Sequence, residues 1–254
     1  MKRILIIGGA IVLVIVLGMG GLVAATFVGR KPIADGAEVG GARIVSDGIV
    51  SFAVFPIGDG KVALIDAGND TEGKALLTEL SRRGLGPDAV SAVLLTHGHT
   101  DHIGGLSKLP NASVMALERE VPLVEGKEGA TGPLLRLMPT RPTGISVARA
   151  LHDGETVMIG DTAVKVYAVP GHTKGSAAYL IRGALFVGDA ADATSDGTLE
   201  GSAWIFSDSQ TDDRASLVAL DQRLRREGEQ VDAIVPAHSG RLEGLGPLDA
   251  FGHD

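Results

Sequence analysis

Hydrophobic and polar positions alternate in short blocks along most of the chain, a pattern that predicts many strands and few helices. Ile49 to Ile57 is rich in Val, Phe and Ile, and Lys61 to Asp66 is a second apolar block. Asp59-Gly60 lies between them as a turn, so the two blocks predict a β-hairpin. Thr71 to Arg83 carries Ala and Leu at helical spacing and ends at Gly84, which predicts a helix with a glycine stop.

Beyond this helix, short apolar blocks separated by turn residues predict a series of further strands. The blocks are Ser91 to Thr96, Ala112 to Leu117, Thr156 to Ile159, Ala163 to Val169, Ala177 to Ile181, Ala184 to Val187 and Val231 to Val235. Ile103 to Leu109 and Thr211 to Arg226 have helical patterns. The region from Glu118 to Ala150 is rich in Pro and Gly, and we predict that it is an irregular insertion that acts as a lid.

The longest apolar run is at the N-terminus, where Ile4 to Gly29 are 26 consecutive residues without a charge. A helix of this length is about 39 Å long, and the hydrocarbon core of a bilayer is about 30 Å thick. Residues 1–31 are therefore predicted to form a transmembrane anchor. The alternative is a cleaved signal peptide, because Lys2 and Arg3 give a basic start and Val23-Ala24-Ala25 resembles a cleavage site.

The rest of the chain divides into a linker and one domain. Residues 32–41 are mostly small or polar and predict a short linker. Residues 42–254 have the size of a single domain. Basic residues flank the apolar run on both sides, so the distribution of charge gives almost no preference for the direction in which the segment crosses the membrane. We expect a membrane-anchored domain outside the cytoplasm, or a secreted or periplasmic protein if the segment is cleaved.

The amino-acid composition excludes several classes of protein and of functional site. Hydrophobic residues make up 44% and charged residues 21% of the 254 residues, which excludes a disordered chain. The absence of Cys excludes disulfides, thiolate metal sites and a cysteine nucleophile. Residues 32–254 carry 19 basic and 31 acidic side chains, a net charge of -12 that disfavours nucleic acid as a partner. Nothing in the composition indicates an oligomeric state.

The sharpest motif is His97-Gly98-His99-Thr100-Asp101-His102, which follows a predicted strand. Imidazole and carboxylate are the ligands that a chain without thiols offers to zinc. Alternate side chains of an extended stretch share one side, so His97 and His99 are predicted to bind one metal ion. Asp101 and His102 follow the bend at this point and are predicted to bind another.

Three further candidate ligands also follow predicted strands. His172 lies in Pro170-Gly171-His172-Thr173, and Asp189 follows Gly188. His238 lies in Pro236-Ala237-His238-Ser239. Strand ends of neighbouring strands meet at one edge of a sheet, so these residues are candidates for the same site.

Taken together, these motifs resemble the metallo-β-lactamase superfamily from residue 42 to about residue 245. The resemblance implies an α/β fold, a four-layer αββα sandwich with a metal site at the edge where the strand-end loops meet. It also implies two Zn²⁺ ions, or two other divalent metal ions. By position, His97, His99 and His172 would bind the first ion, Asp101, His102 and His238 the second, and Asp189 would bridge both.

Asp66, in Leu64-Ile65-Asp66-Ala67-Gly68, matches an acidic residue that in this family supports the ligand loop without binding metal. A carboxylate in that position can fix the orientation of a ligating imidazole. The alternative is an Asp that only turns the end of a strand.

The resemblance implies a metal-dependent hydrolase, in which a hydroxide bridging two zinc ions attacks an ester, thioester, lactone or amide carbonyl. Asp101, itself a ligand, would be the catalytic residue that passes a proton to the leaving group. The expected partner is a small-molecule acyl substrate. Asp189 replaces the Cys of lactamases that use a thiolate, and we expect no glutathione-recognising domain after His238.

Two other functions fit the same motif. One is a mononuclear iron-dependent oxygenase of the persulfide dioxygenase type, which uses a similar first-metal set. The other is a non-catalytic metal-binding domain. Neither needs a complete second set of ligands, so the presence of His102 and His238 favours the hydrolase.

Overall fold

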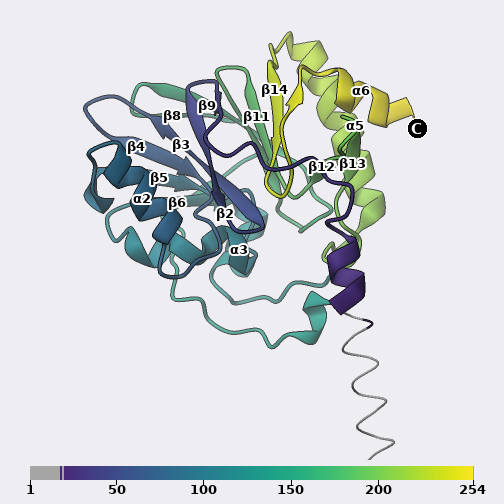
Figure 1. Ribbon diagram of the computed structural model, residues 1–254, viewed down its shortest axis with the longest axis horizontal. Helices are drawn as coiled ribbons and strands as arrows, with labels where there is room; N and C mark the ends of the chain where they lie inside the picture. Colours follow the sequence, from purple (N-terminus) through teal and green to yellow (C-terminus); the bar gives the residue numbers. More distant parts are fainter. Residues whose placement is uncertain (1–17, 19, 254) are drawn as a thin grey trace, which may run out of the picture.

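The computed structural model describes residue 18 and residues 20–253, in which two β-sheets lie face to face (Figure 1). The first sheet has seven strands in the order β1-β2-β3-β4-β5-β6-β7. Its strands are β1 (Glu38–Val39), β2 (Ala42–Asp47), β3 (Val50–Pro56), β4 (Val62–Ile65), β5 (Val90–Leu94), β6 (Ser113–Leu117) and β7 (Arg149–Leu151). Strands β1 to β4 are antiparallel, and β4 to β7 run parallel.

The second sheet has six strands in the order β15-β14-β11-β10-β9-β8, and β12 and β13 form a separate pair. The strands are β8 (Thr156–Ile159), β9 (Thr162–Ala168), β10 (Ala177–Ile181), β11 (Ala184–Gly188), β12 (Ala191–Ala193), β13 (Leu199–Gly201), β14 (Ala233–Pro236) and β15 (Leu242–Glu243). Only β11 and β14 pair in parallel within this sheet.

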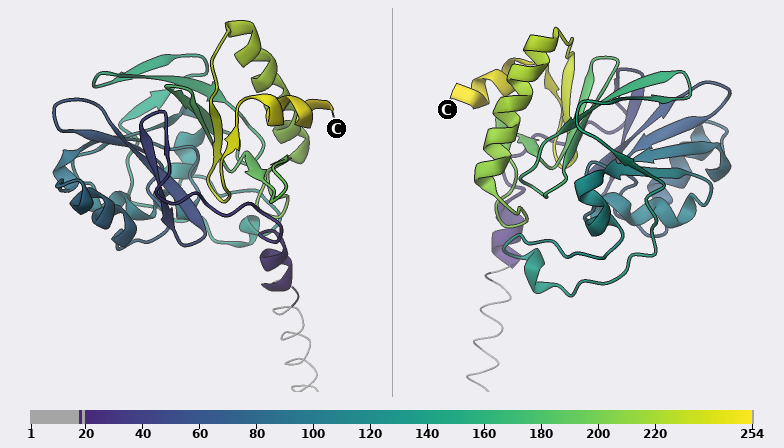
Figure 2. Two further views of the ribbon diagram at one scale, coloured as in Figure 1. Left: turned by 45° about the horizontal axis from the view of Figure 1, so that its top comes forward. Right: turned by 180° about the vertical axis from the view of Figure 1, so that it is seen from behind.

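Helices cover the outer faces of both sheets. The α-helices are α2 (Lys74–Arg82), α3 (Thr100–Ile103), α4 (Val121–Val124), α5 (Gln210–Glu227) and α6 (Gly246–His253). Short 3-10 helices are η1 (Pro87–Ala89), η2 (Gly104–Lys108), η3 (Glu118–Glu120) and η4 (Leu135–Leu137). Helix α2 lies on the first sheet, and α5 and α6 lie on the second (Figures 1 and 2).

Three apolar clusters hold these four layers together. The first lies between the sheets, where Phe55 of β3 and Tyr179 of β10 are fully buried. In the second, Leu76 and Leu80 of α2 pack on the outer face of the first sheet. In the third, Leu217 is one of the α5 residues that pack on the second sheet. Helix, sheet, sheet and helix therefore form the αββα sandwich that the resemblance implied.

Most of the predicted elements are present, with shifted ends. The predicted hairpin forms from β3 and β4. Helix α2 begins at Lys74 and not at Thr71, because the Asp70 carboxylate accepts the backbone N–H groups of Glu72 and Lys74 in a turn before the helix. Strands β2 and β7 were not predicted, since β2 mixes polar with apolar residues and β7 has only three residues.

The N-terminal segment lies against the domain. Residues 20–25 are helical, and the chain then passes beside β12 through an isolated bridge between Arg30 and Thr194. Ile33, Ala34 and Ala37, in the stretch predicted as a linker, pack on the core between the sheets, and β1 follows them.

The predicted transmembrane anchor lies largely outside the described residues. Its apolar run begins at Ile4, whereas the structure describes residue 18 and residues 20–253. Within that part of the chain, no helix is both long enough and apolar enough to cross a bilayer.

Candidate metal centre

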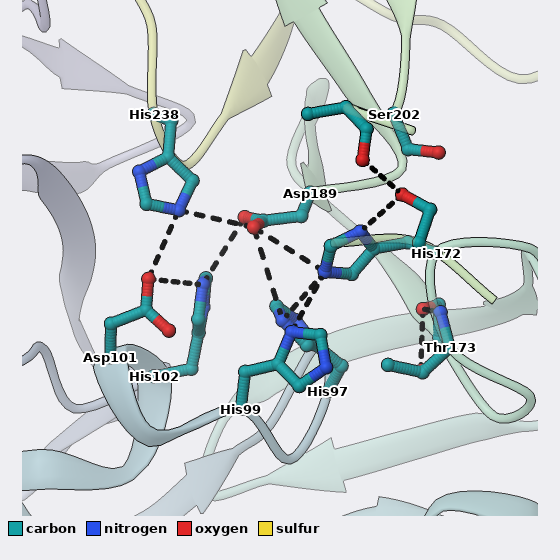
Figure 3. Close-up of polar contacts among 12 residues, drawn as sticks. His97, His99, Asp101, His102, His172, Thr173, Asp189, Ser202 and His238 are labelled. Carbon is teal, nitrogen blue, oxygen red and sulfur yellow. Dashed lines mark hydrogen bonds and ion pairs between the residues drawn. The ribbon is translucent and has the colours of Figure 1, made fainter. Parts of the chain in front are cut away.

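All seven predicted ligands converge at one edge of the sandwich, where loops from both sheets meet (Figure 3). Each ligand follows a strand or begins the short helix after it. His97 and His99 follow β5, Asp101 and His102 lie in α3, His172 follows β9, Asp189 follows β11, and His238 follows β14.

The first ligand set consists of His97, His99 and His172. His172 Nε2 lies 3.2 Å from His97 Nε2 and 3.0 Å from His99 Nδ1. Two nitrogens bound tetrahedrally to one zinc ion lie about 3.3 Å apart, given Zn–N distances of about 2.0 to 2.1 Å. The spacing of these nitrogens therefore suits a single zinc ion.

The second ligand set consists of Asp101, His102, Asp189 and His238. His238 Nε2 lies 3.2 Å from Asp101 Oδ2 and 3.1 Å from Asp189 Oδ2. The same Asp189 oxygen is 3.5 Å from His172 Nε2 in the first set. Asp189 thus lies between the two sets, as a bridging carboxylate requires.

Unpaired buried atoms indicate that the second set suits a cation. Among the residues that the structure describes, His102 Nε2 and Asp189 Oδ1 are buried polar atoms without a hydrogen-bond partner, and they lie 3.2 Å apart. When His102 is neutral and its Nδ1 carries the proton, its Nε2 presents a lone pair to the carboxylate. Two acceptors that face each other at this distance repel unless a cation lies between them.

The outer nitrogens of four imidazoles are held by hydrogen bonds. His238 Nδ1 donates to the carbonyl of Ile49 at 2.7 Å, which leaves Nε2 free to bind metal. His172 Nδ1 lies 3.0 Å from Ser207 Oγ, and that hydroxyl donates to the carbonyl of Ala203 and so accepts from the imidazole. Partners of this kind orient a ligating imidazole and fix its tautomer.

The carboxylate of Asp66 orients the other two of these four imidazoles, those of His102 and His97. Asp66 Oδ2 lies 2.8 Å from His102 Nδ1 and accepts from the Thr96 hydroxyl at 2.7 Å. Because the Thr96 hydroxyl donates to Asp66, it can only accept from His97 Nδ1, which lies 3.2 Å away. Asp66 therefore sets the tautomer of one candidate ligand in each set, directly for His102 and through Thr96 for His97.

The backbone holds Asp66 in this place. Asp66 is 2% exposed, and its Oδ1 accepts the backbone N–H of Thr96 at 2.7 Å. Its φ of 60° is in the left-handed region, which a residue other than Gly adopts at a cost. An Asp that only turns a strand end would not need a contact with His102, so this contact favours the role of a support for the ligand loop.

Charge differs between the two sets. Burial lowers the pKa of His99 to about 4 and that of His172 to about 3, so both imidazoles are neutral at neutral pH, the form that can bind a metal ion. Burial opposes the charged form of His102 as well, but the carboxylates of Asp189, Asp66 and Asp101 raise its pKa well above the usual range. Without a metal ion these carboxylates favour a proton on His102 Nε2, and a divalent cation that binds here would take the place of that proton.

Glu120 is a site residue that the sequence did not indicate. Its carboxylate accepts the backbone N–H of Gly98 at 2.7 Å, the Thr173 hydroxyl at 2.9 Å and the backbone N–H of Gly175 at 2.9 Å. Glu120 thus ties the loop of His97 and His99 to the loop of His172. Gly175 allows a close approach, because a Cβ at this position would lie 2.3 Å from the Glu120 nitrogen. No local pattern marks this carboxylate, since its partners are far away in the sequence.

Five of the seven candidate ligands line a cavity of about 450 Å³, a volume typical of sites for small molecules. Asp101 and His238 line it, and Leu135 and Met138 contribute from the predicted lid insertion. The N-terminal segment also contributes, through Phe27 and other residues. This last wall was not predicted from the sequence.

Comparison with known proteins gives a consistent picture. Residues 47–238 match the family model of the metallo-β-lactamase superfamily. A hydroxyacylglutathione hydrolase from Xanthomonas axonopodis pv. citri is 33% identical over 135 residues, which are 52% of this chain and 42% of that protein. Metallo-beta-lactamase domain-containing protein 1 from Xenopus laevis is 26% identical over 207 residues, which are 79% of this chain and 74% of that protein.

A solved structure shares the fold at low sequence identity. The metallo-β-lactamase MIM-1 from Novosphingobium pentaromativorans has a TM-score of 0.65 and 22% identity, and the match covers 89% of this chain and 88% of that one. The family model spans most of the chain and includes every predicted ligand. The chain therefore belongs to the metallo-β-lactamase superfamily.

Proposed function

We propose that the protein is a metal-dependent hydrolase with two zinc ions, which cleaves an ester, thioester, lactone or amide bond of a small acyl compound. The observation that carries this proposal is the pair of ligand sets that share Asp189. An oxygenase with one iron ion, or a domain that only binds metal, has no use for the second set. The hydroxyacylglutathione hydrolase among the relatives adds support, although this chain matches less than half of its length.

Zinc ions held by these residues would supply a Lewis acid that polarises the carbonyl and lowers the pKa of water to about 7. Hydrolysis adds the oxygen of water to the carbonyl carbon, breaks the bond to the leaving oxygen, sulfur or nitrogen, and moves a proton to that atom. Asp101 is the carboxylate placed to carry this proton, because it lines the cavity and its side chain is 24% exposed. Although burial opposes it, the charge of His102 lowers the pKa of Asp101 to about 2, so its side chain is an ionised carboxylate at neutral pH.

The cavity walls favour an acyl substrate over a phosphodiester. Apolar side chains such as Leu123, Leu135 and Phe206 line it. Arg30, one of its two lining arginines, is already paired with Asp192 at 2.6 Å. A polyanionic substrate is expected to need several free cationic groups.

We expect purified protein to contain close to two zinc ions, or two other divalent ions, per chain, and to hydrolyse acyl substrates. Elemental analysis after gentle purification measures the first quantity. A panel of a chromogenic ester, a thioester, a homoserine lactone, a β-lactam and a phosphodiester, compared by kcat/KM with and without EDTA, measures the second. One iron ion per chain with oxygen consumption would contradict the dinuclear hydrolase. A phosphodiester as the best EDTA-sensitive substrate would contradict the acyl assignment alone.

We further propose that residues 1–31 anchor the protein in a membrane, with the domain outside the cytoplasm. The support is the uncharged run of 26 residues from Ile4 to Gly29. The protein is expected to stay with the membrane fraction in salt and carbonate and to be released by detergent. Recovery of a soluble form that begins at Thr26 would instead identify a cleaved signal peptide. Protease accessibility in intact cells tests the side on which the domain lies.

A further inference from the structure

The cavity above the ligands is walled by three segments that are far apart in the sequence. The N-terminal segment contributes Val23 and Phe27, the lid insertion contributes Leu135 and Met138, and the loop after β13 contributes Phe206. The backbone N–H of Leu134 donates to the carbonyl of Ile205 at 2.9 Å, which joins the second wall to the third. The result is an apolar passage that begins at the ligands and ends at the surface.

Most of the exposed apolar side chains in the described part of the chain lie in the segments that form the rim of this passage. Of the seven large apolar side chains that are exposed, only Met158 on β8 lies in a segment that does not line the cavity. Leu137 and Met138, at the tip of the lid insertion, are 73% and 62% exposed. The other four are Leu22, Val28, Ile49 and Trp204. A gathering of exposed apolar side chains around one opening marks a contact surface for a membrane or an apolar ligand.

The rim also lies where the chain enters the domain from the predicted anchor. The short helix η4 of the lid insertion lies beside the N-terminal helical turns in both views of Figure 2. The exposed Arg136 and Arg141 flank the apolar tip of the insertion. Apolar side chains with cationic neighbours are typical of segments that rest in the headgroup region of a bilayer.

The N-terminal segment is fixed to the domain directly after the apolar run. Arg30 forms a buried ion pair with Asp192 at 2.6 Å, and the backbone N–H of Lys31 donates to the carbonyl of Ala193 at 2.8 Å. The Phe27 ring lies edge-on to the predicted ligand His238, with 5.8 Å between the ring centroids. An anchor that ends at this point leaves the opening of the cavity no more than a few residues from the bilayer surface.

We propose that the natural substrate is an amphipathic acyl compound with a long apolar chain, which reaches the site from the lipid surface. Its chain lies between Phe27 and the tip at Leu137 and Met138, and its ester or thioester carbonyl lies at the metal ligands. This proposal rests on the proposed hydrolase and adds the substrate class. The products are a long-chain carboxylate and the alcohol or thiol that receives the proton.

The test compares p-nitrophenyl butanoate and dodecanoate as substrates of the full-length protein in phosphatidylcholine nanodiscs. Burial of one methylene group raises affinity about fourfold. The dodecanoate chain has eight more methylenes than the butanoate chain, so even their partial burial is expected to raise kcat/KM at least about tenfold. In the variant Leu137→Ser/Met138→Ser, the dodecanoate to butanoate ratio is expected to fall at least about fivefold. Met158→Ser, which changes an apolar side chain that is 59% exposed on a distant strand, is expected to keep the ratio of the unaltered protein.

Fluorescence of Trp204 provides a readout that needs no turnover. It is the single Trp of the chain and lies beside Ala203 in the cavity wall. The free carboxylate dodecanoate is expected to shift the Trp204 emission at concentrations at least about tenfold below those that free butanoate requires. The double variant is expected to lose this difference. Protein that binds dodecanoate selectively but hydrolyses no ester would refute the proposed hydrolase and keep the chain-binding passage. Ester hydrolysis with no preference for chain length in either readout would overturn the passage and leave the hydrolase intact.

Discussion

Replacing Asp101 by Ala is expected to lower kcat/KM at least about 1,000-fold while leaving the fold nearly as stable as before. In the proposed mechanism the side chain contributes in two ways, as a ligand of the second set and as the carrier of the proton. Removal of a general acid–base group alone costs about 100- to 10,000-fold. Its stabilising contacts are few. Oδ2 lies 3.2 Å from His238 Nε2 and 3.8 Å from His102 Nε2, both of which are themselves candidate ligands.

The measurement pairs steady-state kinetics with thermal unfolding of metal-free protein. We expect the melting temperature of Asp101→Ala to stay within a few degrees of the unaltered value, because substitution at a partly exposed site changes stability little. Glu128→Ala is the matched control, since Glu128 lines the same cavity and its side chain is 59% exposed, but its ion-pair partner is Lys174 and not a ligand. Equal losses of activity in both variants would mean that Asp101 has no special role.

The candidate ligands could be predicted from the sequence because each one follows a recognisable apolar strand. His172, for example, follows β9, and His238 follows β14. The polypeptide between them is long, but the sheet brings the strand ends to one edge. A local pattern was therefore sufficient to identify residues that are remote from one another in the chain.

The residues that were missed depend on contacts that no local pattern records. Glu120 is the last residue of the short 3-10 helix η3, in a region that was predicted to be irregular. Its partners lie 22 positions before it and 53 and 55 positions after it in the chain. Phe27 reads as part of an apolar run that predicts a membrane span, and nothing in that run indicates that it also packs beside His238. Phe27 is held in this position by the nearby ion pair between Arg30 and Asp192. Asp192 belongs to no recognisable sequence motif, and only the folded strand β12 brings it to Arg30.

The two ligand sets are joined by a hydrogen-bonded chain as well as by Asp189. Asp66 accepts from His102 Nδ1 and from the Thr96 hydroxyl, and the Thr96 hydroxyl accepts from His97 Nδ1. Every proton in this chain points toward Asp66 because an ionised carboxylate has no proton to donate. Nε2 of His97 and of His102 therefore carry lone pairs that face the metal positions.

Replacing Asp66 by Asn is consequently expected to reduce zinc affinity about 100-fold, the upper end of the range for partners of metal ligands. Asn has nearly the shape of Asp, and its carbonyl oxygen can still accept the Thr96 N–H. Its NH₂ group would occupy the position of Oδ2, where it donates to His102 Nδ1 and to the Thr96 hydroxyl. Both imidazoles would then carry their protons on Nε2, toward the metal positions.

Comparison of Asp66→Asn with Asp66→Ala distinguishes an effect on the imidazole tautomers from a loss of folding stability. Asp66→Ala removes the same carboxylate but leaves buried donors without partners, at a cost of about 1 to 3 kcal/mol each, so it is expected to destabilise the metal-free protein far more than Asp66→Asn. Zinc competition against a chelator measures affinity, circular dichroism of metal-free protein measures stability, and ¹⁵N chemical shifts of the imidazoles report the tautomers. Asp47→Asn is the control, since Asp47 also accepts backbone N–H groups, those of Asn69 and Asp70, and contacts no ligand through them. If Asp66→Asn binds zinc as tightly as Asp47→Asn, the carboxylate does not govern the ligands, and Asp66 only shapes the turn after β4.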